Sequence, residues 1–221
     1  MLHGQAVQSF TLMFLQMWHL GDRVIDFSAY MHDAPSQTAS RFVVPFGDCP
    51  LDQDKVGERV YMDLLNRASR YVHIMTPYLI LDGELETALC FAAERGVDVR
   101  LILPGIPDKK IPYALAKTHY AKLAASGVHI YEYTPGFVHA KVFVVDDREA
   151  VDGTIKLDYR SLYHHFECAT YLCNSSCIAD IEADFQDTLA KCRVVDEACI
   201  RKPGLYNRLV GAIMKGFAPL L

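Results

Sequence analysis

The sequence predicts an α/β fold, a mixed and largely parallel β-sheet flanked by helices. Between residues 71 and 133, apolar segments of strand length alternate with helical segments. The order strand, helix, strand, helix, strand implies right-handed crossovers, and therefore parallel strands covered by helices. After Gly136 the strand segments follow one another without helices between them, which adds antiparallel pairs to the sheet.

The N-terminal part of the chain is predicted to hold two helices and one strand. Apolar side chains three or four residues apart mark one face of a helix over residues 5–20. Residues 22–50 are polar and rich in turn formers, with one strand at residues 41–45. A second helix follows over residues 53–70, where apolar residues recur at steps of four. The face of the first helix consists of Val7, Phe10, Met13, Phe14 and Met17.

The alternating region has clear stop signals. Two helices are each followed by a glycine, Gly96 or Gly127, the residue that usually takes the left-handed conformation after a helix. The first strand stops at Pro77, which cannot donate to a strand ladder. The predicted strands are residues 71–76, 97–103 and 128–133, and the predicted helices are residues 84–95 and 110–126.

The C-terminal part is predicted to add a hairpin, a strand and two helices. The hairpin has its turn at Asp147-Arg148. The tail over residues 205–217 places apolar residues on one stripe with basic residues around it, which fits either a packing helix or a helix lying in an anionic membrane surface. The other segments are strands at residues 140–145, 149–152 and 166–172 and a helix at residues 180–191.

Length and composition favour one compact domain. The chain has 221 residues, of which 51% are hydrophobic and 22% charged, and this excludes disorder as the main state. We expect residues 1–50 to hold the N-terminal helix and a connecting segment, residues 51–192 the α/β core, and residues 193–221 an amphipathic tail. The formal charge of −5 argues against a protein that lives on nucleic acid.

The chain is predicted to be cytoplasmic. Its seven cysteines show no zinc-type spacing, and several stand within apolar runs, as small buried side chains in a reducing compartment do. No stretch approaches the ~20 apolar residues needed to span a bilayer, and no secretory signal opens the sequence. We therefore expect a protein that is soluble or bound peripherally at the inner face of the cell membrane.

One segment combines residues suited to chemistry on phosphate. His139 and Lys141 stand two apart at the start of an apolar strand, so their side chains share a face. The ammonium would neutralise phosphate oxygens while the imidazole bonds to phosphorus or moves a proton. Asp146 stands at the far end of the same strand, a position that favours tying strands together over contact with substrate.

The residues after this segment complete a longer pattern. Asp146 is followed after six residues by Gly153-Thr154, and Glu167 comes later. This arrangement resembles the signature of the phospholipase D superfamily. Residues 153–162 are similar to the second such motif of bacterial cardiolipin synthases, and residues 74–78, 95–100 and 131–137 agree. The resemblance covers essentially the entire chain.

The resemblance implies a role for each motif residue. His139 would be a catalytic histidine that forms a phosphohistidine, with Lys141 and Thr154 binding the phosphate. Glu167 would orient the imidazole by accepting its other N–H, and Asp146 completes the catalytic motif. In the family, phosphatidyl passes from one phosphatidylglycerol to the hydroxyl of another, giving cardiolipin and glycerol. That chemistry requires no metal or other cofactor.

Two residues depart from the family pattern. Lys156 stands where the pattern has asparagine. It is able to bind the substrate phosphate, to pair with Glu167, or to lower the pKa of His139. Asp152 stands where an apolar strand residue is expected, and a buried unpaired carboxylate is costly. Both departures indicate a relaxed or altered site.

The number of motifs is the larger departure. The family builds one active site from two such motifs, with one histidine as nucleophile and the other as general acid. No histidine other than His139 has a lysine two residues on. The chain therefore resembles the C-terminal half of a synthase, without the first motif and the membrane-spanning N-terminus. We expect activity only where a homodimer mate, with His139 opposite its twin, or a partner chain completes the site.

Two further readings stay open. A dimeric single-motif phosphodiesterase acting on nucleic acid would keep the same chemistry, but the net charge argues against it and the basic loop at residues 107–110 is the one candidate surface. A catalytically impaired remnant would merely bind anionic lipid or a partner protein. The His139→Ala variant tests the remnant reading. If the parent shows no turnover and the variant still binds lipid, the chain is a lipid-binding remnant.

Overall fold

The computed structural model describes residues 2, 4–21, 26–31, 41–196, 200, 214 and 216, and every structural statement below concerns these residues. The tail helix predicted over residues 205–217 lies almost wholly outside them, as does Cys199.

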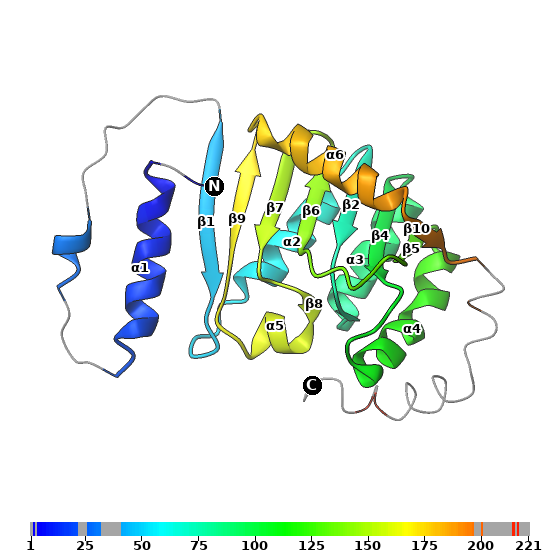
Figure 1. Ribbon diagram of the computed structural model, residues 1–221, viewed down its shortest axis with the longest axis horizontal. Helices are drawn as coiled ribbons and strands as arrows, with labels where there is room; N and C mark the ends of the chain where they lie inside the picture. The colour runs from blue at the N-terminus through cyan, green and yellow to red at the C-terminus, as the bar shows by residue number, and fades with distance from the viewer. Residues whose placement is uncertain are drawn as a thin grey trace.

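An eight-stranded sheet forms the centre of the fold, in the order β1-β9-β7-β6-β2-β4-β5-β10 (Figure 1). A second, two-stranded sheet pairs β3 with β8 in parallel. The strands are β1 (Phe42–Asp48), β2 (Tyr71–Met75), β3 (Leu79–Ile80), β4 (Asp98–Pro104), β5 (His129–Tyr133), β6 (Val142–Val145), β7 (Glu149–Gly153), β8 (Leu157–Asp158), β9 (Glu167–Cys173) and β10 (Cys192–Val194).

The predicted mixed sheet with flanking helices is confirmed, but most of its pairings are antiparallel. In the large sheet, β2, β4 and β5 pair in parallel, as the alternating segments predict. The other five pairings are antiparallel, because the strands after Gly136 lack crossover helices and because both edge strands also run antiparallel to their neighbours. Since β1 and β10 belong to the sheet, it spans residues 42–194 and exceeds the predicted core of residues 51–192.

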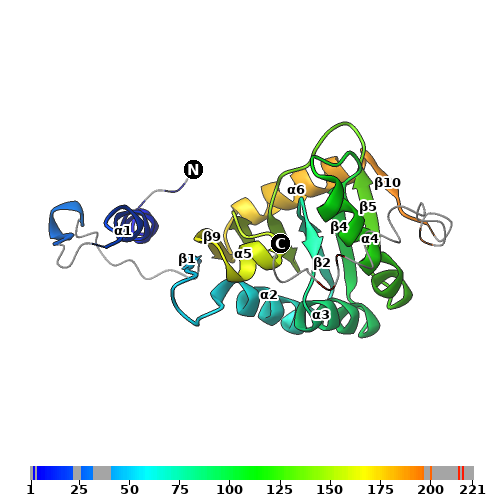
Figure 2. The same cartoon turned by 90° about the horizontal axis from the view of Figure 1, so that it is seen from below.

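Helices cover both faces of the sheet (Figure 2). The helices α2, α3 and α4 pack on one face around the larger core, and α6 packs on the other around a smaller one. Short α5 lies at one end of the strands (Figure 1). The helical segments are α1 (Ala6–Trp18), the 3-10 turn η1 (Ser28–Tyr30), α2 (Val56–Arg67), α3 (Gly83–Glu94), α4 (Lys110–Ala125), α5 (Tyr159–Tyr163) and α6 (Cys177–Leu189).

Strand β6 shows why the sequence reads as a fully buried strand. Phe143 and Val145 point into the larger core, whereas Val142 and Val144 point into the smaller one. All four side chains are buried. A strand covered on both faces needs apolar residues at every position, which gives a continuous run in place of alternation.

Helix α1 lies beyond the edge strand β1, apart from the layers of the core (Figures 1 and 2). The predicted helix is confirmed, but its apolar face stays largely in solvent: Val7 is 42% exposed, Phe14 54% and Met17 44%. Its buried residue is Leu15. The rings of Phe14 and Trp18 stack on this exposed side, with their centroids 5.6 Å apart.

Two findings bear on the predictions about a membrane-spanning helix and about the cysteines. Among the described residues, no helix combines the length and apolar character that crossing a bilayer requires. The six described cysteines are all free thiols, and of these Cys90 is buried while the other five are partly exposed. The prediction of buried cysteines therefore holds for Cys90 alone.

Candidate active site

One edge of the large sheet gathers the motif residues. The carboxyl ends of β2, β4 and β5 meet there with the start of β6, the end of β7 and the start of β9, because β6, β7 and β9 alternate in direction. His139 and Lys141 precede β6, Thr154 follows β7, and Glu167 opens β9. Ligands bind at this edge in open α/β sheets.

His139 and Lys141 lie side by side in the loop before β6. The Lys141 Nζ lies 2.8 Å from Nδ1 of His139 and 3.3 Å from its Nε2, and it also donates to the His139 carbonyl. Both side chains point the same way, as predicted, although the strand begins only at Val142. Since His139 is exposed and Lys141 partly buried, the imidazole is the more accessible of the two.

The surroundings of His139 favour its neutral form. Burial, and then the charges of Lys141 and Lys156, lower the pKa of His139 below its ordinary value. Burial and Lys156 also lower the pKa of Lys141. Because an ammonium offers no lone pair, the bond between them makes the imidazole Nδ1 the acceptor and places the ring proton on Nε2. A neutral imidazole is the form able to act as a nucleophile or base.

Lys156 holds Glu167 in an ion pair. Its Nζ lies 2.7 Å from the Glu167 Oε1, and the Ser161 hydroxyl donates to the same oxygen over 2.7 Å. The Glu167 side chain is only 6% exposed. Burial by itself raises the pKa of Glu167, but the bonds from Lys156 and neighbouring hydroxyls outweigh it and hold that pKa below its usual range. Two of the expected roles of Lys156 are thus present together: the ion pair and the lowered pKa of His139.

The expected bond between Glu167 and His139 does not form among the described residues. The Glu167 carboxylate accepts from Lys156 and Ser161, while the imidazole bonds to Lys141. The physical reason is Lys156: a carboxylate beside an ammonium forms a charge-assisted bond that is roughly twice as strong as one from a neutral donor. Asparagine at this position would carry no charge to attract the carboxylate.

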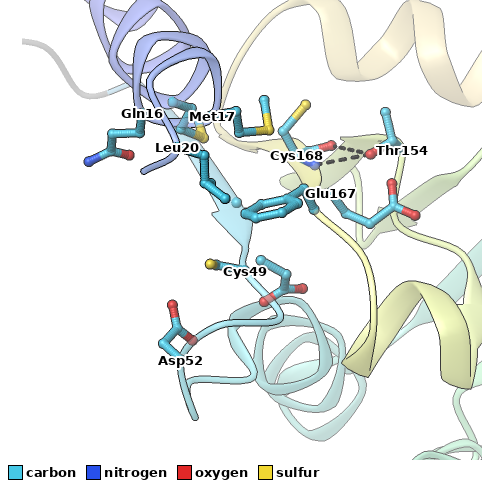
Figure 3. A pocket seen from close by; sticks show the side chains of 12 residues that line it. Gln16, Met17, Leu20, Cys49, Asp52, Thr154, Glu167 and Cys168 are labelled. Atoms are coloured by element: carbon cyan, nitrogen blue, oxygen red, sulfur yellow. Dashed lines mark hydrogen bonds between the residues drawn. The ribbon is translucent and has the colours of Figure 1, made fainter. Parts of the chain in front are cut away.

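Thr154 is bonded to the backbone of the neighbouring strand. Its hydroxyl donates to the Cys168 carbonyl over 3.2 Å and accepts from the Cys168 N–H over 3.0 Å (Figure 3). It lines a cavity of about 550 Å³ between α1 and β1, where Met17 of α1 approaches Cys168 (Figure 3). Glu167 lines both this cavity and the pocket at His139.

Asp146 lies at the opposite end of β6 from His139 and ties the hairpin to the start of β2. Its carboxylate accepts from the Ser69 hydroxyl and from the backbone N–H groups of Ser69, Arg70 and Tyr71. Burial alone would raise the pKa of Asp146, but these hydrogen bonds outweigh it and lower that pKa below its ordinary value. These bonds agree with the expectation that Asp146, at the far end of the strand, ties strands together.

Asp152 also differs from the expectation. We expected a buried carboxylate without a partner, but Asp152 is exposed. Ala150 lies on the same face of β7 and is buried, whereas Asp152 stands one residue before the end of the strand. Partial burial still raises the pKa of Asp152, so the departure has a smaller cost than a fully buried carboxylate would have.

A pocket of about 850 Å³ opens beside His139. Its walls come from five regions: the loop before β6, the β3–β8 pair with the residues beside it, the start of α4, helix α5 with the residues after it, and the start of β9. The sequence pattern names only three of its residues as site residues, His139, Lys156 and Glu167. The other lining residues are Tyr78, Ile80, Lys109, Lys110, Ile111, Pro112, Asp158, Arg160 and His165.

Some of these additional residues had a signal in the sequence. Asp158 and Arg160 belong to the phrase that resembles the synthase motif, and Lys109-Lys110 form the basic loop. Their convergence on His139 depends on β3 and β8, which are two residues long and give no periodicity to detect.

One cluster of carboxylates offers metal-type ligands elsewhere. Glu58, Asp82 and Glu84 place one oxygen each within 4.8 Å of the others. Two of them already accept hydrogen bonds from the hydroxyl of Tyr163, and Asp82 caps α3 at the Leu85 N–H. The cluster lines no part of the pocket at His139, and these bonds explain it as a structural feature.

Comparison with known proteins agrees with this geometry. Residues 61–189 match the family described as cardiolipin synthase, PLD-like domain. The chain is 57% identical over its full length to an uncharacterised protein of Streptococcus mutans, covering 48% of that protein. It is 32% identical to cardiolipin synthase 2 of Bacillus anthracis, covering 43% of it. The chain thus spans less than half the length of these relatives.

Solved structures show the same fold. Phosphatidylserine synthase of Haemophilus influenzae superposes with a TM-score of 0.65 at 18% identity, over 86% of this chain and 48% of that one. Nuc of Salmonella typhimurium, a phospholipase D family member, superposes with a TM-score of 0.60 at 18% identity, over 70% of this chain and 98% of that one.

Proposed function

Since the chain belongs to the phospholipase D-like domain family of cardiolipin synthases, we propose that it is one half of a phosphatidyltransferase that moves phosphatidyl between phosphatidylglycerol molecules. The observation that carries this proposal is the His139–Lys141 pair, 2.8 Å apart beside a pocket of about 850 Å³. A volume of this order lies within the ~300–1,000 Å³ typical of small-molecule sites.

The first step frees the nucleophile. A phosphodiester in the pocket competes with the imidazole for the Lys141 ammonium, because an anionic oxygen is the stronger acceptor. Lys141 then binds a phosphate oxygen and releases the His139 lone pair. The lowered pKa of His139 keeps that lone pair available at neutral pH. Thr154 contributes a further donor only if its hydroxyl leaves the Cys168 carbonyl.

The second step is an exchange at phosphorus. The His139 nitrogen bonds to phosphorus, the bond to the glycerol oxygen breaks, and the leaving oxygen takes a proton from a general acid. In the return step the hydroxyl of a second phosphatidylglycerol bonds to phosphorus, the P–N bond breaks, and the hydroxyl proton returns to the same group. Lys141 and Lys156 stabilise the charge on the nonbridging oxygens.

A second motif, outside these 221 residues, supplies the general acid in this proposal. The sequence holds a single motif, and the chain covers less than half of its relatives. The exposed position of His139 leaves room for a second motif to face it. A homodimer with a two-fold axis through the pocket mouth, or a partner chain carrying the first motif, completes the site. Because both substrates are lipids, the site works at the inner surface of the cell membrane.

The test uses purified chain and phosphatidylglycerol vesicles, with cardiolipin and phosphatidic acid followed by mass spectrometry. Cardiolipin formed by the parent and lost in His139→Ala supports the proposal, and its second-order dependence on protein concentration would identify the dimer. If the parent forms neither product, the same assay is repeated with a chain that carries the first motif. Silence in both assays, with vesicle binding retained in His139→Ala, overturns the transferase in favour of a lipid-binding remnant. Cleavage of nucleic acid in its place would identify a nuclease.

A further inference from the structure

The pocket at His139 carries a second set of cations away from the motif. Lys109 and Lys110 stand where α4 begins, and Arg160 lies on α5. All three are exposed, yet they line the same cavity as His139 and Lys156. The cavity therefore has cationic residues on two separate parts of its wall.

These cations have no acidic partner among the described residues. No ion pair joins Lys109, Lys110 or Arg160 to another described side chain. Arg160 donates to Nε2 of His165 over 2.9 Å, a bond to a neutral nitrogen acceptor, and makes no ion pair with a described carboxylate. Lys109 lies over the ring of Tyr78, 5.9 Å from its centroid. This part of the pocket is therefore positively charged, although the chain has a formal charge of −5.

The acidic groups near the pocket are engaged elsewhere. Glu167 is paired with Lys156. Asp158 is buried and caps α5 at the Ser161 N–H, and burial raises its pKa. Asp108 accepts a hydrogen bond from the Tyr78 hydroxyl over 2.5 Å. Asp158 nevertheless attracts Arg160, and its Oδ2 is buried without a hydrogen-bond partner among the described residues.

The start of α4 adds to the positive potential. The helix is 16 residues long and its N-cap residue, Lys109, makes no side-chain cap. The first N–H groups of such a helix lack internal partners and favour an anion. Lysines at this end oppose the helix dipole, so they stabilise the fold less than acidic residues would. A negatively charged ligand at this end of α4 would offset that opposition.

We propose that Lys109, Lys110 and Arg160 bind the phosphate of the acceptor phospholipid, while Lys141 and Lys156 bind the phosphate that is transferred. This inference rests on the proposed function and assigns the residues that hold its acceptor. An acceptor phosphatidylglycerol carries its phosphate on the same glycerol as its attacking hydroxyl. One pocket with two phosphate sites would hold donor and acceptor together.

A competition between acceptors tests the selectivity. Phosphatidylglycerol vesicles are mixed with deuterated glycerol, so that transfer to lipid gives cardiolipin and transfer to glycerol gives labelled phosphatidylglycerol. In the Lys110→Ala/Arg160→Ala double variant we expect cardiolipin to fall at least ~tenfold more than glycerol exchange, since each charged hydrogen bond contributes enough for about that factor. Lys191→Ala, an exposed lysine outside the pocket, should leave the ratio unchanged. Equal losses of both products overturn the proposal.

A binding count separates this proposal from the function itself. The probe is glycerophosphoglycerol, the soluble headgroup, titrated by calorimetry. We expect two molecules bound per parent chain and one in the double variant, with the remaining one lost on further change of Lys141 to alanine. The same stoichiometry in parent and double variant refutes the second site whether or not the chain turns over lipid. A change from two to one without any lipid product would refute the transferase and keep the site.

Discussion

The ammonium of Lys156 lies 2.7 Å from the carboxylate of Glu167, and its charge also lowers the pKa of His139. Lys156 therefore supplies the partner of the carboxylate and, after burial and the charge of Lys141, contributes to the lowered pKa of the His139 imidazole. In a site with asparagine at this position, the carboxylate has no cation to hold it. The predictions that follow test what this substitution and the surrounding framework contribute.

Lys156→Asn is expected to raise the pKa of His139. The variant removes one of the two ammonium groups that disfavour the protonated imidazole, and it frees Glu167 to attract a ring N–H. An NMR titration that follows the imidazole Cε1 proton measures the change. Lys191→Asn removes an exposed lysine that does not act on His139 and should leave the titration where it is. An unaltered His139 pKa in Lys156→Asn would show that Lys156 does not control the imidazole.

The acid and alkaline limits of activity of the completed site are both expected to lie at lower pH than for an ordinary histidine and lysine. His139 attacks as a neutral group, and its pKa lies below 6.5, so the rate should begin to fall only at more acid pH. On the alkaline side the rate falls when the general acid of the second motif loses its proton, and the lowered pKa of Lys141, which binds phosphate as a cation, brings its own loss earlier than for an ordinary lysine. The pH dependence of kcat/KM reports both groups in the free enzyme. An acid limb at or above pH 6.5 contradicts the assignment of His139.

The sheet and its helices follow from local patterns, whereas the site depends on meetings between distant segments. The run of apolar residues in β6 predicts a strand buried on both faces, and the position of this strand places His139 at the edge of the sheet. The partner of Glu167 is set by a charge placed eleven residues earlier, and only the fold shows that the two side chains meet. The apolar periodicity of α1 predicts a helix, but it does not show which other element packs against the apolar face, and much of that face is exposed.

Replacing Asp146 is expected to destabilise the fold and to leave the pocket geometry intact. Asp146→Ala removes the acceptor of four hydrogen bonds at the far end of β6, which should cost about 1–3 kcal/mol of the free energy of unfolding. Urea denaturation measures this cost, with Asp187→Ala, an exposed residue of α6, as control. Since the pKa of Asp146 is lowered from 3.8, its contribution is present above that pH and lost as the pH falls through its folded value. A stable variant with altered phosphate-ester binding would return Asp146 to the site.

Gly153→Ala tests how closely β7 and β9 must approach to place Thr154 and Glu167. A Cβ at this position would lie 2.4 Å from the Cys168 carbonyl oxygen and 2.5 Å from Ala169, atoms of the neighbouring backbone that have no freedom to move aside. We expect a loss of about 1–3 kcal/mol in the free energy of unfolding, as for other overpacked sites, together with a shifted NMR signal of the Cys168 amide, which donates to Thr154. Gly83→Ala is the matched control, because no atom lies within 4 Å of its added Cβ and alanine suits the first turn of α3. Equal stability of the two variants would mean that the strands can separate without cost, and the glycine would then have no part in positioning the site.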